Sequence, residues 1–352
     1  MIPEGGMPAG IDIPIDIPGF GSAALLPTAD GMTNASTPIR LEAGVSTPIT
    51  ITASGGRAGG PTQVRVAWMT PDLERARIDE AVKAAQTARA VVVFAYDEGT
   101  EGRDRASLSL PGYQDALIDA VAAANPRTVV VLNNGAPILM PWADKVAGIL
   151  QMWYPGQEGA DATAAILVGE AAPSGRLPVT FPRRAEDAPT APPERYPGVN
   201  GKGAYSEGIF VGYRWYDKQN VEPLFPFGHG LSYTTFAYSG LSVRRVTDSY
   251  DVRFTIKNTG AREGIEVPQI YVGPPPNPPA PMAVKKLVGF ERVTLGPGQS
   301  RQVTVRVDAR GLSYWSDKEH KWTVAPGRRT FMVGASSRNI ALKSEVQVRA
   351  GR

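Results

Sequence analysis

The chain has 352 residues, of which 37 are Lys or Arg and 34 are Asp or Glu, so its formal net charge at pH 7 is +3. Hydrophobic residues make up 42% of the chain and charged residues 20%, which is typical of a folded protein and excludes a disordered tail or a highly charged arm. With no Cys and two His, the composition excludes a disulfide framework and a cysteine nucleophile, and we expect no metal and no cofactor.

Three further features of the whole chain bear on its partners. The basic residues are scattered, which argues against nucleic-acid binding. The longest apolar runs, 90–95 and 128–132, are far shorter than the roughly 20 residues of a membrane-spanning helix. The first residues lack the basic start and apolar core of a signal peptide. We therefore expect neither a nucleic-acid nor a membrane partner, and a length that suits two or three domains.

Residues 1–70 are rich in Gly, Pro and Thr, and short pieces such as 39–42 and 49–52 alternate between apolar and polar residues. That period of two predicts short strands. The segment is too short to indicate a complete domain, and we interpret it as a β-rich N-terminal piece.

Residues 71–204 change character and predict an α/β domain. Thr70, Pro71 and Asp72 supply a cap, a first-turn proline and a first-turn acid, which together begin a helix. Buried strands are then expected at 90–95, 128–133 and 148–154, and helices at 111–124, stopped by Asn125-Pro126, and 158–168, closed by Gly169. This alternation predicts a largely parallel sheet in an α/β sandwich, whose function gathers beyond the carboxyl ends of the strands.

The second half of the chain predicts an aromatic linker, 205–236, followed by an all-β domain, 237–352. The aromatic residues of the linker suit either stacking on sugar rings or packing two domains together. Seven short strands match an immunoglobulin-like or fibronectin type III-like β-sandwich. They are expected at 250–257, 266–272, 287–293, 300–307, 321–324, 329–334 and 345–349.

The most polar stretch of the α/β region, 96–105, follows the strand 90–95 directly. It holds the acids Asp97, Glu98, Glu101 and Asp104 together with two arginines, one of them Arg105. A carboxyl group held near a guanidinium at the end of a buried strand suits control of a protonation state. The alternative is a solvated loop whose charges neutralise one another.

Other candidate sites carry weaker signals. Glycines flank His229, which favours a structural histidine in a turn over a catalytic one. The Gly-Gln-Glu-Gly run at 156–159 precedes a helix and suits a tight turn better than a phosphate loop, because it lacks the lysine and the spacing of one. No Gly-x-Gly-x-x-Gly follows a strand, which disfavours a nucleotide-binding domain.

Several motifs together resemble the C-terminal part of glycoside hydrolase family 3, the family of β-glucosidases and related exo-acting enzymes. The resemblance covers roughly residues 75–350. Its motifs are 101–105 (EGRDR), 108–112, 133–142, 153–159 (WYPGQEG), 173–182, 207–215, 226–236, 257–260, 289–293 and 334–338.

This resemblance implies a retaining hydrolysis of β-glucosides or related glycosides, with an Asp nucleophile and a Glu general acid/base on different domains. The glutamate of the EGRDR motif, Glu101, is then the acid/base, with Glu98 as the fallback. Asp104 and Arg105 are expected to position it. Retaining pairs stand about 5.5 Å apart with one member ionised and the other protonated.

The chain also departs from the family's pattern. The nucleophile of the family lies on an N-terminal (β/α)8 barrel with a Ser-Asp-Trp motif, whereas Trp315-Ser316-Asp317 has the wrong order and lies in the sandwich. Residues 1–70 resemble the tail of an inserted carbohydrate-binding module. We therefore expect a C-terminal portion that needs the barrel as its partner and has negligible activity alone; the alternative is a non-catalytic carbohydrate-binding or adhesion protein.

Overall fold

The structure of the chain is a computed structural model that describes residues 39–50, 69–97, 105 and 107–349. The chain divides into two compact units. The described residues up to Ala136, together with Met140–Pro155, form the first unit, and Pro137–Leu139 with Gly156 onward form the second. Among the described residues, no helix has the length and apolar character that crossing a bilayer requires.

The first unit is built on a parallel sheet. Its strands are β1 (Val91–Tyr96), β2 (Thr128–Asn133) and β3 (Gly148–Gln151), in the order β1-β2-β3. Val91 pairs with Thr128 and Val129 with Gly148, so all three strands run in the same direction and end at the same edge. The valine-rich sequences of β1 and β2 suit such a sheet because β-branched side chains fit a pleated, buried surface.

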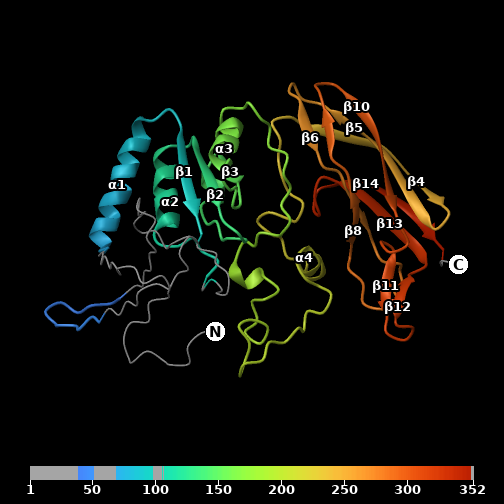
Figure 1. The fold of residues 1–352 in the computed structure, drawn as a ribbon, viewed down its shortest axis with the longest axis horizontal. Helices are drawn as coiled ribbons and strands as arrows, with labels where there is room; N and C mark the ends of the chain where they lie inside the picture. Colours follow the sequence, from blue (N-terminus) through green and yellow to red (C-terminus); the bar gives the residue numbers. More distant parts are fainter. Residues whose placement is uncertain (1–38, 51–68, 98–104, 106, 350–352) are drawn as a thin grey trace, which may run out of the picture. The chain divides into compact units, whose positions relative to one another are not determined.

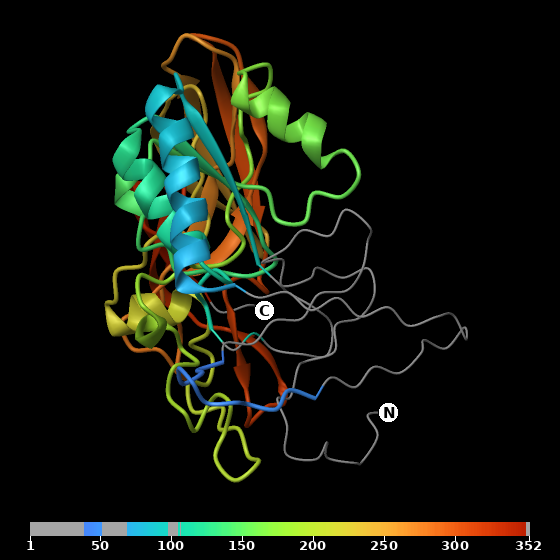
Figure 2. The same ribbon diagram turned by 90° about the vertical axis from the view of Figure 1, so that its left-hand side faces the viewer.

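Two helices, α1 (Pro71–Thr87) and α2 (Gln114–Ala124), lie together on one side of this sheet (Figures 1 and 2), and a 3-10 turn, η1 (Ala143–Lys145), precedes β3. The hydroxyl of Thr70 caps α1 by accepting a hydrogen bond from the Leu73 N–H at 3.2 Å. Asn125 ends α2, and its amide Nδ2 donates to the carbonyls of Ala85 and Ala88, both at 2.9 Å. One polar side chain thereby ties the ends of both helices.

The second unit begins with irregular chain that carries α3 (Gly159–Leu167), η2 (Ala185–Asp187) and α4 (Tyr213–Gln219). Gly169 follows α3 with a φ of +80°, a left-handed conformation that ends the helix without a Cβ clash. The remainder of this unit is a β-sandwich.

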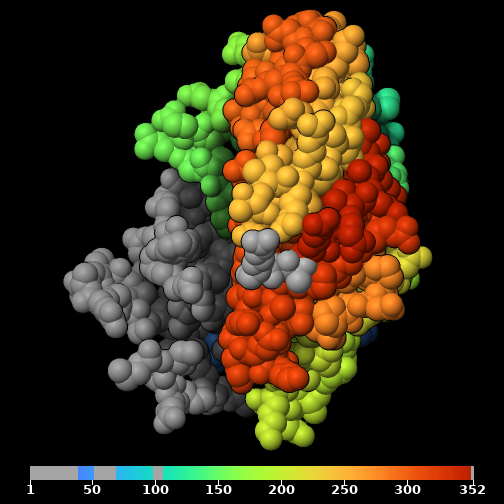
Figure 3. All heavy atoms as spheres, turned by 90° about the vertical axis from the view of Figure 1, so that its right-hand side faces the viewer, coloured from blue at the N-terminus to red at the C-terminus, as the bar shows by residue number. Residues whose placement is uncertain are grey.

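Two antiparallel sheets make up most of the sandwich, one in the order β10-β5-β4 and one in the order β14-β13-β7-β8, with the pairs β6-β9 and β11-β12 beside them. Figure 3 shows one face, on which β4 and β5 in gold and orange lie beside β13 and β14 in red. The strands are β4 (Phe236–Val246), β5 (Ser249–Asn258), β6 (Gly264–Glu266), β7 (Gln269–Val272), β8 (Lys286–Phe290), β9 (Val293–Leu295), β10 (Ser300–Val307), β11 (Ser313–Ser316), β12 (Lys321–Val324), β13 (Gly327–Gly334) and β14 (Ile340–Val348).

The core of the sandwich comes from alternate residues of facing strands. On β5, Val252, Phe254 and Ile256 are fully buried while the residues between them are not, and Val303, Val305 and Val307 of β10 repeat the pattern. Phe331 and Val333 of β13 fill the opposing side. This alternation is what the sequence displays as a period of two.

The expected fold class, an α/β sandwich domain followed by a fibronectin type III-like domain, is confirmed, while several element boundaries differ from expectation. Pro268 divides the expected strand 266–272 into β6 and β7, because proline has no N–H for a ladder. The expected strand 287–293 is likewise two strands, β8 and β9. The helix α4 and the strands β4 and β11 were not predicted. The division at residues 70, 204 and 236 stays a prediction.

Candidate functional site

Of the four residues expected at the site, Arg105 belongs to the described part of the chain. Glu98, Glu101 and Asp104 lie outside the described residues. Arg105 lies at the carboxyl edge of the parallel sheet in the first unit. The sequence pattern indicated this edge as the functional one.

Asp97, the residue directly after β1, is the centre of this edge. Its side chain is 1% exposed, and its Oδ2 accepts a hydrogen bond from Arg105 Nη1 at 2.8 Å. Its Oδ1 accepts one from the Tyr154 hydroxyl at 2.6 Å and one from the Gly135 N–H at 3.3 Å. Three donors therefore satisfy a carboxylate whose burial would otherwise be costly.

Gly135 is required here by close approach rather than by its backbone angles. A Cβ at this position would lie 2.6 Å from the Tyr154 ring, too close for any side chain. The absence of a Cβ lets the Tyr154 ring lie against the chain beyond β2 while its hydroxyl reaches Asp97. The segment that follows β3 is thus joined to the ends of β1 and β2.

Amide side chains fix the remaining strand ends. Gln114 at the start of α2 accepts from the Tyr96 N–H at 3.0 Å and donates to the Tyr96 carbonyl at 2.9 Å, which continues the ladder at the end of β1. Gln151 on β3 donates to the Asn134 side chain at 2.8 Å, and Asn134 donates to the Ala136 carbonyl at 2.7 Å. The whole carboxyl edge is therefore held by polar contacts.

This geometry divides the acids of the stretch 96–105 by role. Asp97 is occupied by three donors and buried, so it is a structural anion. Its ion pair with Arg105 joins residues on either side of the segment 98–104, which carries Glu98, Glu101 and Asp104. The partner of Arg105 is thus Asp97, an acid to which the sequence pattern assigned no role. Its place directly after a buried strand was the available signal.

Two other candidates, His229 and the aromatic stretch 205–236, lie in the second unit. The His229 ring stacks on Phe225 with centroids 5.2 Å apart. Burial lowers the pKa of the His229 imidazole from its ordinary 6.5, and the Arg176 guanidinium lowers it further. Its backbone carbonyl accepts from the Leu177 N–H at 2.8 Å. A neutral ring fixed in a turn agrees with the structural interpretation of this histidine.

Tyr213 in the aromatic stretch 205–236 packs within the second unit. Tyr213 of α4 is buried, and its ring lies 4.8 Å from Phe227 and 6.0 Å from Tyr271 of β7. Its hydroxyl accepts a hydrogen bond from the Leu287 N–H of β8 at 2.9 Å. For Tyr213, packing rather than sugar stacking is therefore its structural role.

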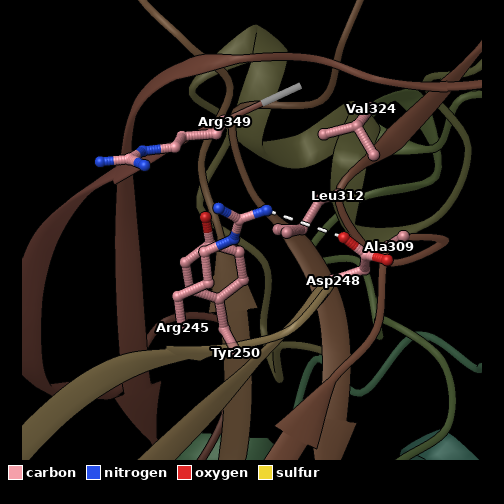
Figure 4. A pocket seen from close by; sticks show the side chains of 7 residues that line it. All are labelled: Arg245, Asp248, Tyr250, Ala309, Leu312, Val324 and Arg349. Atoms are coloured by element: carbon pink, nitrogen blue, oxygen red, sulfur yellow. Dashed lines mark ion pairs between the residues drawn. The ribbon is translucent and has the colours of Figure 1, made fainter. Parts of the chain in front are cut away.

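The described residues offer no group of three His, Cys, Asp or Glu side chains that could hold a metal ion. One hollow of the sandwich, near the turn between β4 and β5, has a volume of about 20 Å³, room for roughly one water molecule. Figure 4 shows Arg245 in it, between Tyr250 and Asp248, with which Arg245 forms an ion pair at 3.7 Å. A hollow of this size does not admit a sugar ring.

Comparison with known families and proteins gives consistent matches. The family described as "Glycosyl hydrolase family 3 C-terminal domain" matches residues 18–233, and "Fibronectin type III-like domain" matches residues 266–337. Thermostable beta-glucosidase B of Acetivibrio thermocellus is 43% identical over 77% of this chain and 36% of its own length. Beta-glucosidase B of Emericella nidulans is 39% identical over 85% of this chain and 38% of its own.

Solved structures give the same picture. DesR, a beta-glucosidase from Streptomyces venezuelae solved in complex with D-glucose, is 52% identical with a TM-score of 0.78, covering 80% of this chain and 36% of that one. The GH3 beta-glucosidase of Bifidobacterium adolescentis is 38% identical with a TM-score of 0.74, covering 78% of this chain and 41% of that one. The chain spans little more than a third of the length of these relatives.

Proposed function

Because the chain belongs to glycosyl hydrolase family 3, we propose that it is the C-terminal portion of a retaining β-glucosidase-type exo-enzyme that hydrolyses terminal, non-reducing β-D-glycosides. Glu101 is the general acid/base in this proposal, with Glu98 as the fallback, and Asp104 and Arg105 position it. The nucleophilic carboxylate comes from a barrel domain outside this chain. A β-glucoside or related glycoside is the substrate.

The observation that carries the proposal is the ion pair of Asp97 with Arg105 at the carboxyl edge of the parallel sheet. It ties the two sides of a segment of seven residues, 98–104, to an edge that Tyr154, Gly135 and Gln114 hold in place. A catalytic acid that must meet a substrate held mainly by another domain needs a rigid structural support of this kind. The reason is that a misplacement of 1 Å can lower a rate about a hundredfold.

The chemistry follows from two successive proton transfers at one carboxyl group. The protonated Glu101 carboxyl gives its proton to the glycosidic oxygen while the C–O bond breaks and the nucleophile of the barrel bonds to the anomeric carbon. The Glu101 carboxylate then takes a proton from the water that attacks this carbon, which releases the sugar with retained configuration and restores both carboxyl groups. One carboxyl group cannot perform both displacements, so the chain alone should have negligible activity.

Leaving-group dependence tests the role of Glu101. The chain is combined with the barrel-bearing N-terminal portion of a family 3 β-glucosidase and assayed on two aryl β-glucosides. Glu101→Gln should lower kcat/KM by roughly 10²- to 10⁴-fold on the aryl glucoside with a basic leaving group, which needs a proton. The loss should be much smaller on a dinitrophenyl glucoside, and azide should restore turnover.

Glu98→Gln is the matched control, since it removes the same charge three residues away. We expect its activity within a few-fold of the parent. The leaving-group pattern in Glu98→Gln instead would transfer the role to Glu98, and its absence from both variants would refute the assignment to this segment. Hydrolysis by the chain without the barrel portion, lost in Glu101→Gln, would contradict the need for a second domain.

A further inference from the structure

Two tryptophans on the sandwich of the second unit are exposed side by side. Trp315 of β11 and Trp322 of β12 are cross-strand partners, with ring centroids 5.4 Å apart and an interplanar angle of 64°. They are 44% and 47% exposed. Tryptophan has the largest apolar surface of any side chain. Neither of these two tryptophans belongs to the core of the sandwich, so their exposed apolar surface is not explained by core packing.

A cation lies against this pair. The guanidinium carbon of Arg310 is 3.0 Å from the centroid of the Trp322 ring. The ring holds the planar guanidinium in one orientation, which leaves its N–H fork available to a carboxylate at its edge. Lys286 of β8 is a second cation close to Arg310, because its Nζ donates to the Arg310 carbonyl at 3.3 Å.

Arg214 of α4 is a third cation, close enough to Lys286 for its charge to act on the Lys286 ammonium. The Arg214 guanidinium carbon is 5.6 Å from the Tyr213 ring, whose hydroxyl bonds the N–H of Leu287, the neighbour of Lys286. Burial lowers the pKa of Lys286, and nearby arginines lower it further. The acid that acts in the opposite sense, Asp308, already accepts the Gly311 N–H at 2.8 Å.

Asp308 is near Lys286, but it does not form an ion pair with any of the three cations. No described carboxylate forms an ion pair with Arg214, Lys286 or Arg310, whereas the residue next to Lys286 does have one: Lys285 Nζ lies 2.7 Å from Asp217. Gathering three cations without ion-paired acids costs mutual repulsion, which an anionic ligand would relieve.

We propose that Arg214, Lys286, Arg310, Trp315 and Trp322 form a binding surface, the tryptophan–cation surface, for an acidic oligosaccharide that carries uronic acid carboxylates. The Arg310 fork and the two other cations bind the carboxylates, and the exposed indole surfaces pack against the apolar faces of the sugar rings. A saccharide is favoured over another polyanion because the chain belongs to a glycoside-hydrolysing family. The surface lies outside the segment that carries Glu101, and its occupation requires no hydrolysis.

The test measures binding to the full chain by calorimetry at low salt. The probes are an oligogalacturonide, a neutral cello-oligosaccharide of equal length and a single-stranded DNA oligonucleotide. The double variant K286Q/R310Q should weaken oligogalacturonide binding about tenfold, and Trp322→Ala should weaken it by a similar factor. Lys343→Gln is the matched control. Lys343 is an exposed cation on β14, and β14 forms the edge of the sheet opposite to β8, the strand that carries Lys286.

The proposal is supported if the oligogalacturonide binds, salt weakens the binding, the neutral oligosaccharide does not bind, and Lys343→Gln behaves as the parent. Absence of oligogalacturonide binding would overturn it. So would equal binding of the neutral sugar, unchanged affinity in both surface variants with folding verified by circular dichroism, or tighter binding of DNA than of the oligogalacturonide. Each result is independent of glycosidase activity, so the proposed function stands or falls separately.

Discussion

Replacing Asp97 with asparagine tests whether a buried anion holds the carboxyl edge of the sheet. The change keeps the shape but removes the charge and places an amide N–H against the Arg105 guanidinium. Breaking a buried ion pair costs roughly 3–5 kcal/mol. The Arg105 side chain is 17% exposed and the asparagine oxygen can still accept from Tyr154 or Gly135, so we expect about 2–3 kcal/mol.

The assay must report on the first unit alone, because a chain with two units need not unfold in one step. Hydrogen exchange of peptides covering β1 and β2 meets this need, and the expected loss should speed exchange of their protected amides by roughly 30- to 150-fold. Asp119→Asn is the control, since its ion pair with Lys145 lies on the surface and should cost less than about 0.5 kcal/mol. Equal exchange in the two variants would refute a role for Asp97 as the anchor of this edge.

Two further changes probe the second unit. Burial lowers the pKa of His229, so the unfolded chain binds a proton more readily than the folded chain as pH falls below the ordinary value of 6.5, and the parent should lose stability there. Melting temperatures at about pH 7.5 and 5.5 should show a smaller loss for His229→Phe than for the parent. The control His320→Asn, at an exposed turn, should lose as much as the parent. Arg329 is 1% exposed, and its guanidinium donates to backbone carbonyls at 3.1 and 3.2 Å, among others. Arg329→Met should therefore lower the free energy of unfolding of the sandwich in urea by roughly 2–4 kcal/mol. The control Arg328→Met, at an exposed neighbour, should change it by less than about 0.5 kcal/mol. Similar losses in the two variants would contradict a structural role for the buried Arg329 guanidinium.

Arg329 also illustrates why a strand pattern leaves the core incompletely specified. The expected strand 329–334 matches β13, yet its first residue is a buried arginine, the reverse of what its charge suggests. Burial lowers the pKa of Arg329 to about 10, so it still carries its proton at neutral pH. Its partners are backbone carbonyls of Gly273, Leu312 and Ala325, which no side-chain pattern displays.

Local chemistry alone determined much of the secondary structure. Thr70, Pro71 and Asp72 set the start of α1, the Asn125-Pro126 pair set the end of α2, and the valine run 128–133 matches β2 to the residue. Each of these signals acts between residues a few positions apart, through a cap, a missing N–H or side-chain branching. The family motifs likewise lie in short runs, and they pointed to the correct family.

Only the tertiary structure decided which acid of the stretch 96–105 is buried and what it serves. Asp97 and its neighbours have the same charge and similar sequence surroundings, but the hydroxyl that fixes Asp97 belongs to Tyr154, 57 residues later. The same holds for Arg214, Lys286 and Arg310, which come from α4, β8 and the turn before β11. The cost of burying a charge depends on partners that folding brings together, and their distance along the chain leaves no periodic trace in the sequence.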